Sequence, residues 1–579
     1  MPIRTRSGEW LTARRHKGRS EVNAVSADAR LRALHEREWA WRRREFAGAD
    51  DEDNLAEPAA HLPRVDAATQ AARGDYWRAA LSELEAIPHR ELSAQAQVDA
   101  QVFAAQLHER LDDLRFRAHE LPFNSDTAFW SNLGFTARRP FQDCDDAERY
   151  LGILADIPRY FTEHIENMRA GLARGFSLPR TVMAGPLSSL AEVLKPQAIE
   201  DNLFFTPFHL LPASIDAASA ASLRERATRL IRDAVLPAWR DLEAFIGGQY
   251  AAQARSTLAA RDMPDGAAYY RMCIRKYVTA DMTPEAIHAI GTAEVADIRA
   301  RMQEAMTDAG FTGSLPEFFD FLRCDPQFQA RSAEELLMHA AWIMKRVDGV
   351  IGRFIGHLPR TPIALHPVPD ELAPHYTSGR GGPGLYLLNT HNLPIRPLYT
   401  LPALTLHEAS PGHGMQMALA AELDHLPEFR RHTHLSAYTE GWALYCEWLG
   451  QEMGLYRTAH ERFGMLVFQM WRACRLVVDT GLHHFGWSRE QAVSYMLENT
   501  SLSPQEIAGE VDRYIAWPAQ ALSYHLGQIA IRNARARAEM VLGSRFDLRA
   551  FHDIVLALGS VPLPVLDAQV DAWLQSLAG

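Results

Sequence analysis

One short stretch, HEASPGH at residues 407–413, limits the local fold of this 579-residue chain more than any other feature. Zinc hydrolases commonly carry His-Glu-x-x-His on a helix, because residues four apart share one face and can hold one metal ion. Here the second histidine follows the first by six positions, which on an unbroken helix points the two imidazoles roughly 120° apart. A continuous helix therefore cannot bring His407 and His413 to one small cation.

The residues between the two histidines suggest how the helix is interrupted. Pro411 lacks the amide proton that would bond to the His407 carbonyl, and its ring crowds that carbonyl. Gly412 adds backbone freedom. If Pro411 and Gly412 are extruded as a bulge, the remaining residues read His-Glu-Ala-Ser-His, which is the metal-binding spacing. We predict this bulge, although the stretch by itself leaves a metal site and a chance match equally open.

The fold class follows from helical periodicity. The segments 29–118, 145–174, 217–250 and 285–309 repeat apolar residues every three or four positions. We therefore predict a mostly α fold, with a disordered tail at 1–27 and one helical domain at 28–579, divided into an N-terminal helical half, 28–360, and a metal-site half, 361–579.

Charge and hydropathy exclude two classes of partner. The formal net charge of −12 argues against nucleic-acid binding, which needs clustered positive charge. No apolar run is long enough to span a membrane, and residues 1–27 lack the apolar segment of a secretory signal. We expect a cytoplasmic protein, with a periplasmic location as the alternative if the start codon is misplaced.

A glycine-rich segment, residues 378–384, precedes the motif and leads into the strand-like run 385–389. It formally matches the Gly-x-Gly-x-x-Gly pattern of dinucleotide sites, but a strand follows where a helix should begin, so we reject that function. The segment instead predicts a small hairpin, with 385–389 as an edge strand beside the metal helix. Such an edge can pair with an extended peptide, although a hairpin that only packs is equally open.

A third metal ligand is needed, and Glu440 is the candidate. It lies among apolar and aromatic residues in the predicted helix 438–447, where an unpaired carboxylate is costly to bury. The alternative is a charge at a helix N-terminus that faces solvent. Glu447, two turns further on, fits a role in supporting a ligand from behind.

Two later stretches offer polar side chains on apolar helices. Asp479 and His483 lie one turn apart, so Asp479 could orient a ligand histidine and His483 could donate to an oxygen. A satisfied hydrogen bond in the core is equally possible. Tyr524 and His525 could donate to an oxyanion, although helical tyrosines usually belong to the core.

Together these motifs resemble those of the domain of unknown function 885 family, over roughly residues 28–579. The residues that carry the resemblance are Gly384-x-Tyr386, Asn389, the 407–413 stretch, Tyr438-x-Glu440-Gly441-Trp442, Asp479-x-Gly481-x-His483 and Tyr524-x-Leu526-Gly527-Gln528. That family resembles helical zinc peptidases with a deep channel, including thermostable bacterial carboxypeptidases and angiotensin-converting enzyme.

The resemblance implies a site and a reaction. One zinc ion per chain would be held by His407, His413 and Glu440, and Glu408 would be the catalytic base. This chain departs from the family at Gly414, where members often have a second histidine.

A second departure is His525, where family members often have lysine. With Tyr386 and Asn389, His525 completes the predicted substrate contacts. Tyr524 and His483 are the predicted oxyanion donors.

We therefore expect a zinc-dependent metallopeptidase that hydrolyses short peptides. The alternatives are a catalytically inactive scaffold that binds a peptide or partner, and a zinc hydrolase of other amides or esters. The direction of cleavage and the oligomeric state stay open.

Overall fold

The computed structural model describes residues 26–48, 57–125, 127–370 and 372–578. Most of these residues are helical, which confirms the predicted mostly α fold. Residues 1–25 of the predicted tail lie outside the described ranges. The end of that predicted tail is wrong, because Ser26 caps the first helix and Ala27 begins it.

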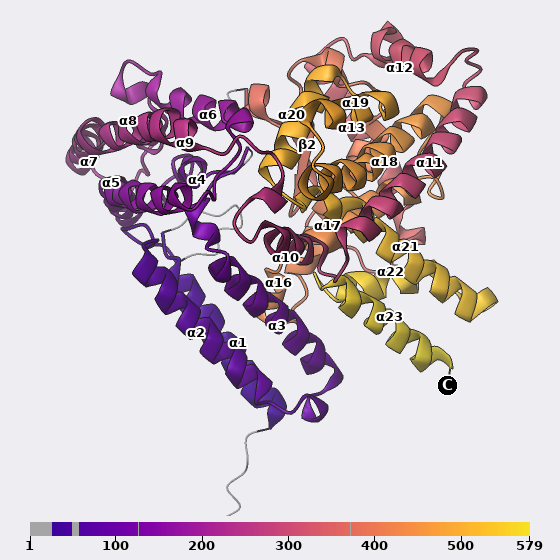
Figure 1. The fold of residues 1–579 in the computed structure, drawn as a ribbon, viewed down its shortest axis with the longest axis horizontal. Helices are drawn as coiled ribbons and strands as arrows, with labels where there is room; N and C mark the ends of the chain where they lie inside the picture. The colour runs from indigo at the N-terminus through magenta and orange to yellow at the C-terminus, as the bar shows by residue number, and fades with distance from the viewer. Residues whose placement is uncertain (1–25, 49–56, 126, 371, 579) are drawn as a thin grey trace, which may run out of the picture.

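Three long helices lie side by side at one end of the molecule (Figure 1, indigo). Each begins after a serine or aspartate whose side chain accepts a hydrogen bond from a backbone N–H of the first turn. They are α1 (Ala27–Glu45), α2 (Ala67–Glu85) and α3 (Ala94–Arg115).

A second group of helices, purple to magenta in Figure 1, lies above the first. It comprises α4 (Phe129–Thr136), α5 (Cys144–Ala173), α6 (Ala184–Leu194), α7 (Ala217–Leu230), α8 (Leu236–Ala244) and α9 (Ala251–Gln253), followed by α10 (Gly266–Val278) near the centre of the molecule. The π-helical segments Ile231–Val235 and Phe245–Tyr250 join α7, α8 and α9.

The remaining helices form the half of the molecule that carries the motif. They are α11 (Pro284–Asp308), α12 (Leu315–Cys324), α13 (Ala333–Asp348), α14 (Leu401–Glu408), α15 (His413–Ala421), α16 (Glu428–Arg431), α17 (Ser436–Leu449), α18 (Ala459–Thr480), α19 (Arg489–Asn499), α20 (Pro504–Ala516), α21 (Ser523–Leu542), α22 (Leu548–Ala557) and α23 (Leu563–Ala578). Here α11 packs along α18, and α17 packs along α21.

Two glycines let α17 and α21 approach each other closely. A Cβ atom on Gly441 would lie 2.6 Å from the Gly527 Cα, and one on Gly527 would lie 1.9 Å from the Ala437 carbonyl oxygen. Any larger side chain would force the two helices apart, because real Cβ atoms do not approach other atoms so closely. The crossing therefore fixes the position of Glu440, the residue before Gly441.

A three-stranded sheet lies beside α14. Its strands are β1 (Ala364–Pro367), β2 (Gly379–Gly382) and β3 (Leu385–Leu388), in the order β1-β3-β2. β3 pairs in parallel with β1 and antiparallel with β2. The predicted strand at 385–389 exists, but its placement at the edge is wrong, because the glycine-rich segment itself forms a strand that covers it.

The glycines of β2 let this edge strand contact the motif. A Cβ atom on Gly381 would lie 2.1 Å from the Glu408 carbonyl oxygen and 2.6 Å from the His413 Cβ. A side chain at this position would therefore push β2 away from α14 and α15. The glycine-rich composition of β2 is explained by this close packing.

Candidate metal centre

The break between α14 and α15 has the form of a two-residue bulge. The Gly412 N–H donates to the Leu406 carbonyl over 3.0 Å, and the Met415 N–H donates to the Ala409 carbonyl over 3.1 Å. Each bond spans six positions, whereas an α-helix spans four, so two additional residues are accommodated. A Cβ atom on Gly412 would lie 1.9 Å from the His407 carbonyl oxygen, so this position requires glycine. The predicted bulge is confirmed.

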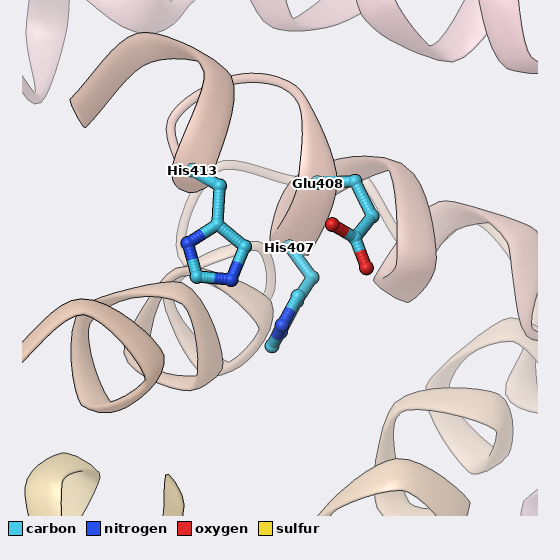
Figure 2. A group of neighbouring side chains, drawn as sticks. All are labelled: His407, Glu408 and His413. Atoms are coloured by element: carbon cyan, nitrogen blue, oxygen red, sulfur yellow. The ribbon is translucent and has the colours of Figure 1, made fainter. Parts of the chain in front are cut away.

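The bulge brings the two histidines together. The ring centroids of His407 and His413 are 4.8 Å apart and the rings are nearly perpendicular, at 87°. Figure 2 shows both side chains, with Glu408, reaching into one space from α14 and the start of α15. The predicted convergence of His407 and His413 is therefore confirmed.

Glu440 completes the group from α17. Its Oε2 lies 3.4 Å from the Nε2 of His407 and 3.2 Å from the Nε2 of His413. Ligands about 2.0–2.1 Å from a tetrahedral zinc ion are separated from each other by about 3.3 Å. Both separations from Glu440 therefore match the distance between two ligands of one zinc ion.

The charge at this centre is strongly unbalanced. The Nδ1 of His407 lies 2.8 Å from the Oε1 of Glu447, which is fully buried. If Nδ1 carries the proton, the lone pair of Nε2 faces the Glu440 carboxylate, and two acceptors cannot bond to each other. Burial lowers the pKa of His407, but Glu440 and Glu447 outweigh it and raise this pKa to about 10. The space between these groups therefore requires a proton or a cation.

Glu408 lies beside the three proposed ligands and is held by the sheet. Its Oε2 accepts a hydrogen bond of 2.7 Å from the Gly381 N–H. A Glu408 oxygen, together with one nitrogen each of His407 and His413, forms a group whose atoms lie within 4.8 Å of one another. Glu408 could thus be taken for the third ligand, but its Oε2 already binds β2, whereas the Glu440 Oε2 lies 3.4 and 3.2 Å from the two histidine nitrogens. Glu440 is therefore the better candidate for a third ligand, and Glu408 stays the candidate base.

Comparison with known proteins places the chain among bacterial proteins of unknown function. The family described as "Bacterial protein of unknown function (DUF885)" matches residues 44–570. The chain belongs to this family. No curated protein matches the sequence.

Two solved structures share the fold of this DUF885 protein. A protein from Colwellia psychrerythraea, provisionally assigned as a lipoprotein, is 26% identical with a TM-score of 0.88, over 96% of this chain and 100% of its own. A provisional lipoprotein of unknown function from Shewanella oneidensis is 18% identical with a TM-score of 0.67, over 94% of this chain and 99% of its own. Within the described residues, no helix is both long and apolar enough to cross a membrane.

His483, a predicted oxyanion donor, has a different environment in this DUF885 protein. It is fully buried, its Nδ1 accepts from the Ala260 N–H over 3.1 Å, and its Nε2 donates to the Tyr514 carbonyl over 2.8 Å. Burial lowers the pKa of His483 to about 3, so the ring is neutral near pH 7. Both nitrogens are used, so His483 has no donor for an oxyanion and its predicted catalytic role is contradicted.

Asp479, one turn from His483, is also a core residue. Its carboxylate accepts hydrogen bonds from the Tyr270 hydroxyl over 2.6 Å and from the Ala519 N–H over 3.1 Å. These bonds connect α18 to α10 and to Ala519, which precedes the short helix Gln520–Leu522. The predicted role of Asp479 in orienting a ligand histidine is contradicted, and Glu447 has that position instead.

The three predicted substrate contacts are all buried. Tyr386 lies beneath the sheet with none of its surface exposed. The Asn389 side chain donates to the carbonyls of three residues in the loop before β2, Ala373, Tyr376 and Thr377. His525 is buried beside Glu294, with 2.9 Å between its Nε2 and the Glu294 Oε2. Asn389 is used within the scaffold, which contradicts its prediction as a substrate contact, whereas the roles of Tyr386 and His525 stay predictions.

Tyr524 lies close to the charged groups behind the centre. Arg472 has its Nη2 3.9 Å from the Glu447 Oε1 and its Cζ 5.9 Å from the Tyr524 ring. Tyr524 is on α21, almost one turn before Gly527. Gly527 contacts Gly441 of α17, the residue that follows Glu440. Its role as an oxyanion donor stays a prediction.

Two polar residues near Glu408 were not identified from the sequence. Burial and the charge of Glu408 raise the pKa of Tyr376 to about 12. The charges of Glu408 and Glu440 also act on Arg380 of β2. The available signal was Arg380 itself, a long cationic side chain among glycines next to the motif.

Proposed function

We propose that this protein is a zinc-dependent metallopeptidase that hydrolyses short peptides. One observation carries the proposal: the Nε2 atoms of His407 and His413 lie 3.4 and 3.2 Å from the Oε2 of Glu440. Two imidazoles and a carboxylate are a ligand set of catalytic zinc sites, which keep a fourth position for water. Glu408, beside this group, supplies the base that peptide hydrolysis requires.

Glu408 and Glu447 have different roles in the proposed hydrolysis. A bound zinc ion would polarise the substrate carbonyl and make water acidic near neutral pH. Glu408 accepts a proton from the water as its oxygen joins the carbonyl carbon, and passes the proton to the amine as the C–N bond breaks. Glu447 holds the His407 ring through Nδ1, which fixes the orientation of Nε2.

The developing oxyanion needs a donor, and two tyrosines are the candidates. Tyr524 is on α21, where its hydroxyl lies 3.4 Å from the Gln520 side-chain nitrogen, and Tyr376 is close enough to Glu408 for its pKa to respond to that charge. One oxyanion donor is typically worth about 3–4 kcal/mol of transition-state stabilisation. Tyr524→Phe and Tyr376→Phe separate the two candidates.

The outer edge of β2 suits an extended peptide. The Asn389 N–H donates to the Ser378 carbonyl, so in this antiparallel pair Ser378 and every second residue after it bond to β3. Gly379 and Gly381 therefore turn their N–H and C=O groups away from β3. A peptide bound to this edge would lie along the side where Gly381 contacts Glu408.

Metal analysis and one conservative substitution test the proposal. The purified protein should bind one zinc ion per chain and cleave peptides from a mixed di- and oligopeptide panel. Glu408→Gln should keep the zinc and lose about 10²–10⁴-fold in kcat. Glu461→Gln alters the glutamate of another His-Glu pair and should change neither. Full activity of Glu408→Gln would contradict the assignment.

The alternatives give different outcomes in the same assay. If the protein binds peptides but does not bind zinc and does not cleave the peptides, it is the inactive scaffold. Zinc binding with hydrolysis of only ester or non-peptide amide substrates would indicate the broader hydrolase.

We also propose that the protein is exported, which revises the expected cytoplasmic location. The support is that two structural neighbours have been assigned, provisionally, as lipoproteins. Cell fractionation with the native gene tests the compartment.

A further inference from the structure

An apolar pocket lies beside the metal helix. Leu401 and Leu404 of α14 line one side, and Phe468 and Trp471 of α18 are also in the wall. The pocket has a volume of about 120 Å³, many times the space of about 10–15 Å³ that one water molecule needs. It can therefore accommodate a large amino-acid side chain.

Two elements connect this pocket to the catalytic base. Leu404 precedes Glu408 by four residues on α14, so the two lie on one face and about 6 Å apart along the helix. Ser378, also in the pocket wall, precedes Gly379, where a Cβ atom would lie 3.5 Å from the Glu408 Cγ. The pocket wall and the contact with Glu408 are therefore formed by consecutive residues of the chain, Ser378 and Gly379.

The direction of β2 determines which part of a peptide reaches the pocket. Antiparallel pairing is the more stable arrangement of two strands. A peptide antiparallel to β2 runs from Gly381, which binds Glu408, toward Ser378, which lines the pocket. The residue that follows the cleaved bond is then the one that enters the pocket.

Arg396 gives the pocket a positive group. Its Nη1 donates to the Ser378 Oγ over 2.6 Å, whereas its Nε is buried and has no hydrogen-bond partner among the described residues. Glu506 also lines the pocket, but its Oε2 accepts from the Ser503 N–H in the cap of α20. A partly buried guanidinium in the pocket wall suits a carboxylate ligand, because such charge-assisted bonds are strong.

We propose that this pocket binds the C-terminal residue of the substrate, with a large apolar or aromatic side chain against Leu404 and Trp471 and its terminal carboxylate on Arg396. The enzyme would then be a carboxypeptidase that releases apolar C-terminal residues. This assignment rests on the proposed peptidase function for its catalytic meaning, but the binding it requires can be measured separately.

The kinetic test compares N-acetylated peptides that differ only at the C-terminus. Peptides ending in free phenylalanine should be cleaved with a KM at least tenfold below that of the same peptides ending in phenylalanine amide or aspartate. Arg396→Gln should raise the KM for the free acid by about 10–100-fold with little change in kcat. Arg396→Lys should recover part of this loss, and Arg331→Gln, at an exposed arginine, should change nothing. Equal KM values for acid and amide in the native protein would overturn the assignment.

The binding test does not need catalysis. N-acetyl-phenylalanine should bind the Glu408→Gln protein in calorimetry and lose about 10–100-fold in affinity when Arg396→Gln is added. Binding that depends on Arg396 without hydrolysis by native protein would support the pocket and contradict the peptidase. Hydrolysis with no preference for the C-terminal residue would support the peptidase and overturn the pocket assignment.

Discussion

Two buried histidines on neighbouring helices of this protein have opposite chemical environments. His483 has both nitrogens satisfied, one by the Ala260 N–H and one by the Tyr514 carbonyl. His407 has one nitrogen on Glu447, while the other faces the carboxylate of Glu440. Burial lowers the pKa of His483, with a smaller contribution from the charge of Arg255, whereas the two carboxylates raise that of His407.

The difference separates a structural histidine from a ligand. A ring with one donor and one acceptor as partners is complete and requires nothing further. A ring aimed at a carboxylate, with a second imidazole 3.2 Å from the same oxygen, needs either additional protons or a cation to hold the group together. Burial is the same for both residues, so the identity of the partners distinguishes them.

The largest expected effect tests this distinction directly. His407→Ala removes one of three ligands, so we expect zinc content near zero after dialysis and loss of peptide hydrolysis. His483→Ala should keep one zinc per chain and instead reduce the free energy of unfolding, by about 1–3 kcal/mol for each of the two backbone groups left unpaired. Metal analysis and urea unfolding measure both quantities. Loss of zinc from both variants would show that the two histidines do not differ in this way.

A second prediction concerns the hydrogen bond between Glu447 and His407. Glu447→Gln should reduce zinc affinity by about 10–100-fold, because the partner that orients His407 is weakened while the ligands stay. Asp479→Asn, the matching change beside His483, should leave zinc affinity unchanged. Competition with a chromophoric chelator measures the affinities. An equal effect of both substitutions would contradict a specific role for Glu447.

The sequence was sufficient to predict the helices and the convergence of His407 with His413. Helical spacing predicted the segments 145–174 and 285–309, which the structure has as Cys144–Ala173 and Pro284–Asp308. Glu440 was identifiable because a carboxylate among aromatic residues needs a partner. Pro411 and Gly412 indicated the bulge through their local backbone chemistry.

The errors concern partners that lie far away in sequence. Asn389 and His483 are polar residues near motifs, and nothing local reveals that carbonyls or N–H groups of other segments already bond to them. The glycine-rich segment was expected to lead into an edge strand at 385–389, and it forms the edge strand itself. Its strand forms because Gly381 must fit against Glu408 and His413, a contact between segments.

That contact gives a prediction with its own control inside β2. Gly381→Ala would place a Cβ atom 2.1 Å from the Glu408 carbonyl oxygen, so β2 must move away from the metal helix. We expect a loss of about 1–3 kcal/mol in stability and a marked fall in kcat, because the Gly381 N–H also holds Glu408. In Gly382→Ala the nearest atom to the new Cβ is 4.0 Å away, so neither quantity should change much. Thermal unfolding and peptide hydrolysis compare the two variants, and equal behaviour would argue against close packing of β2 on the motif.

The smallest effect is a pH dependence that belongs to His483. Its pKa is about 3 in the folded protein and 6.5 as the ordinary value, so the unfolded chain binds more protons between these limits. The stabilisation is complete above pH 6.5 and is lost as the pH falls toward 3, by at most about 1.4 kcal/mol per pH unit. His483→Gln cannot gain this proton. Its stability deficit against the native protein should therefore shrink from pH 7.5 to pH 5 in urea unfolding, by about 2 kcal/mol. Other buried histidines titrate in both proteins and cancel in the difference, so a deficit that does not vary with pH would mean that His483 is not held neutral in the core.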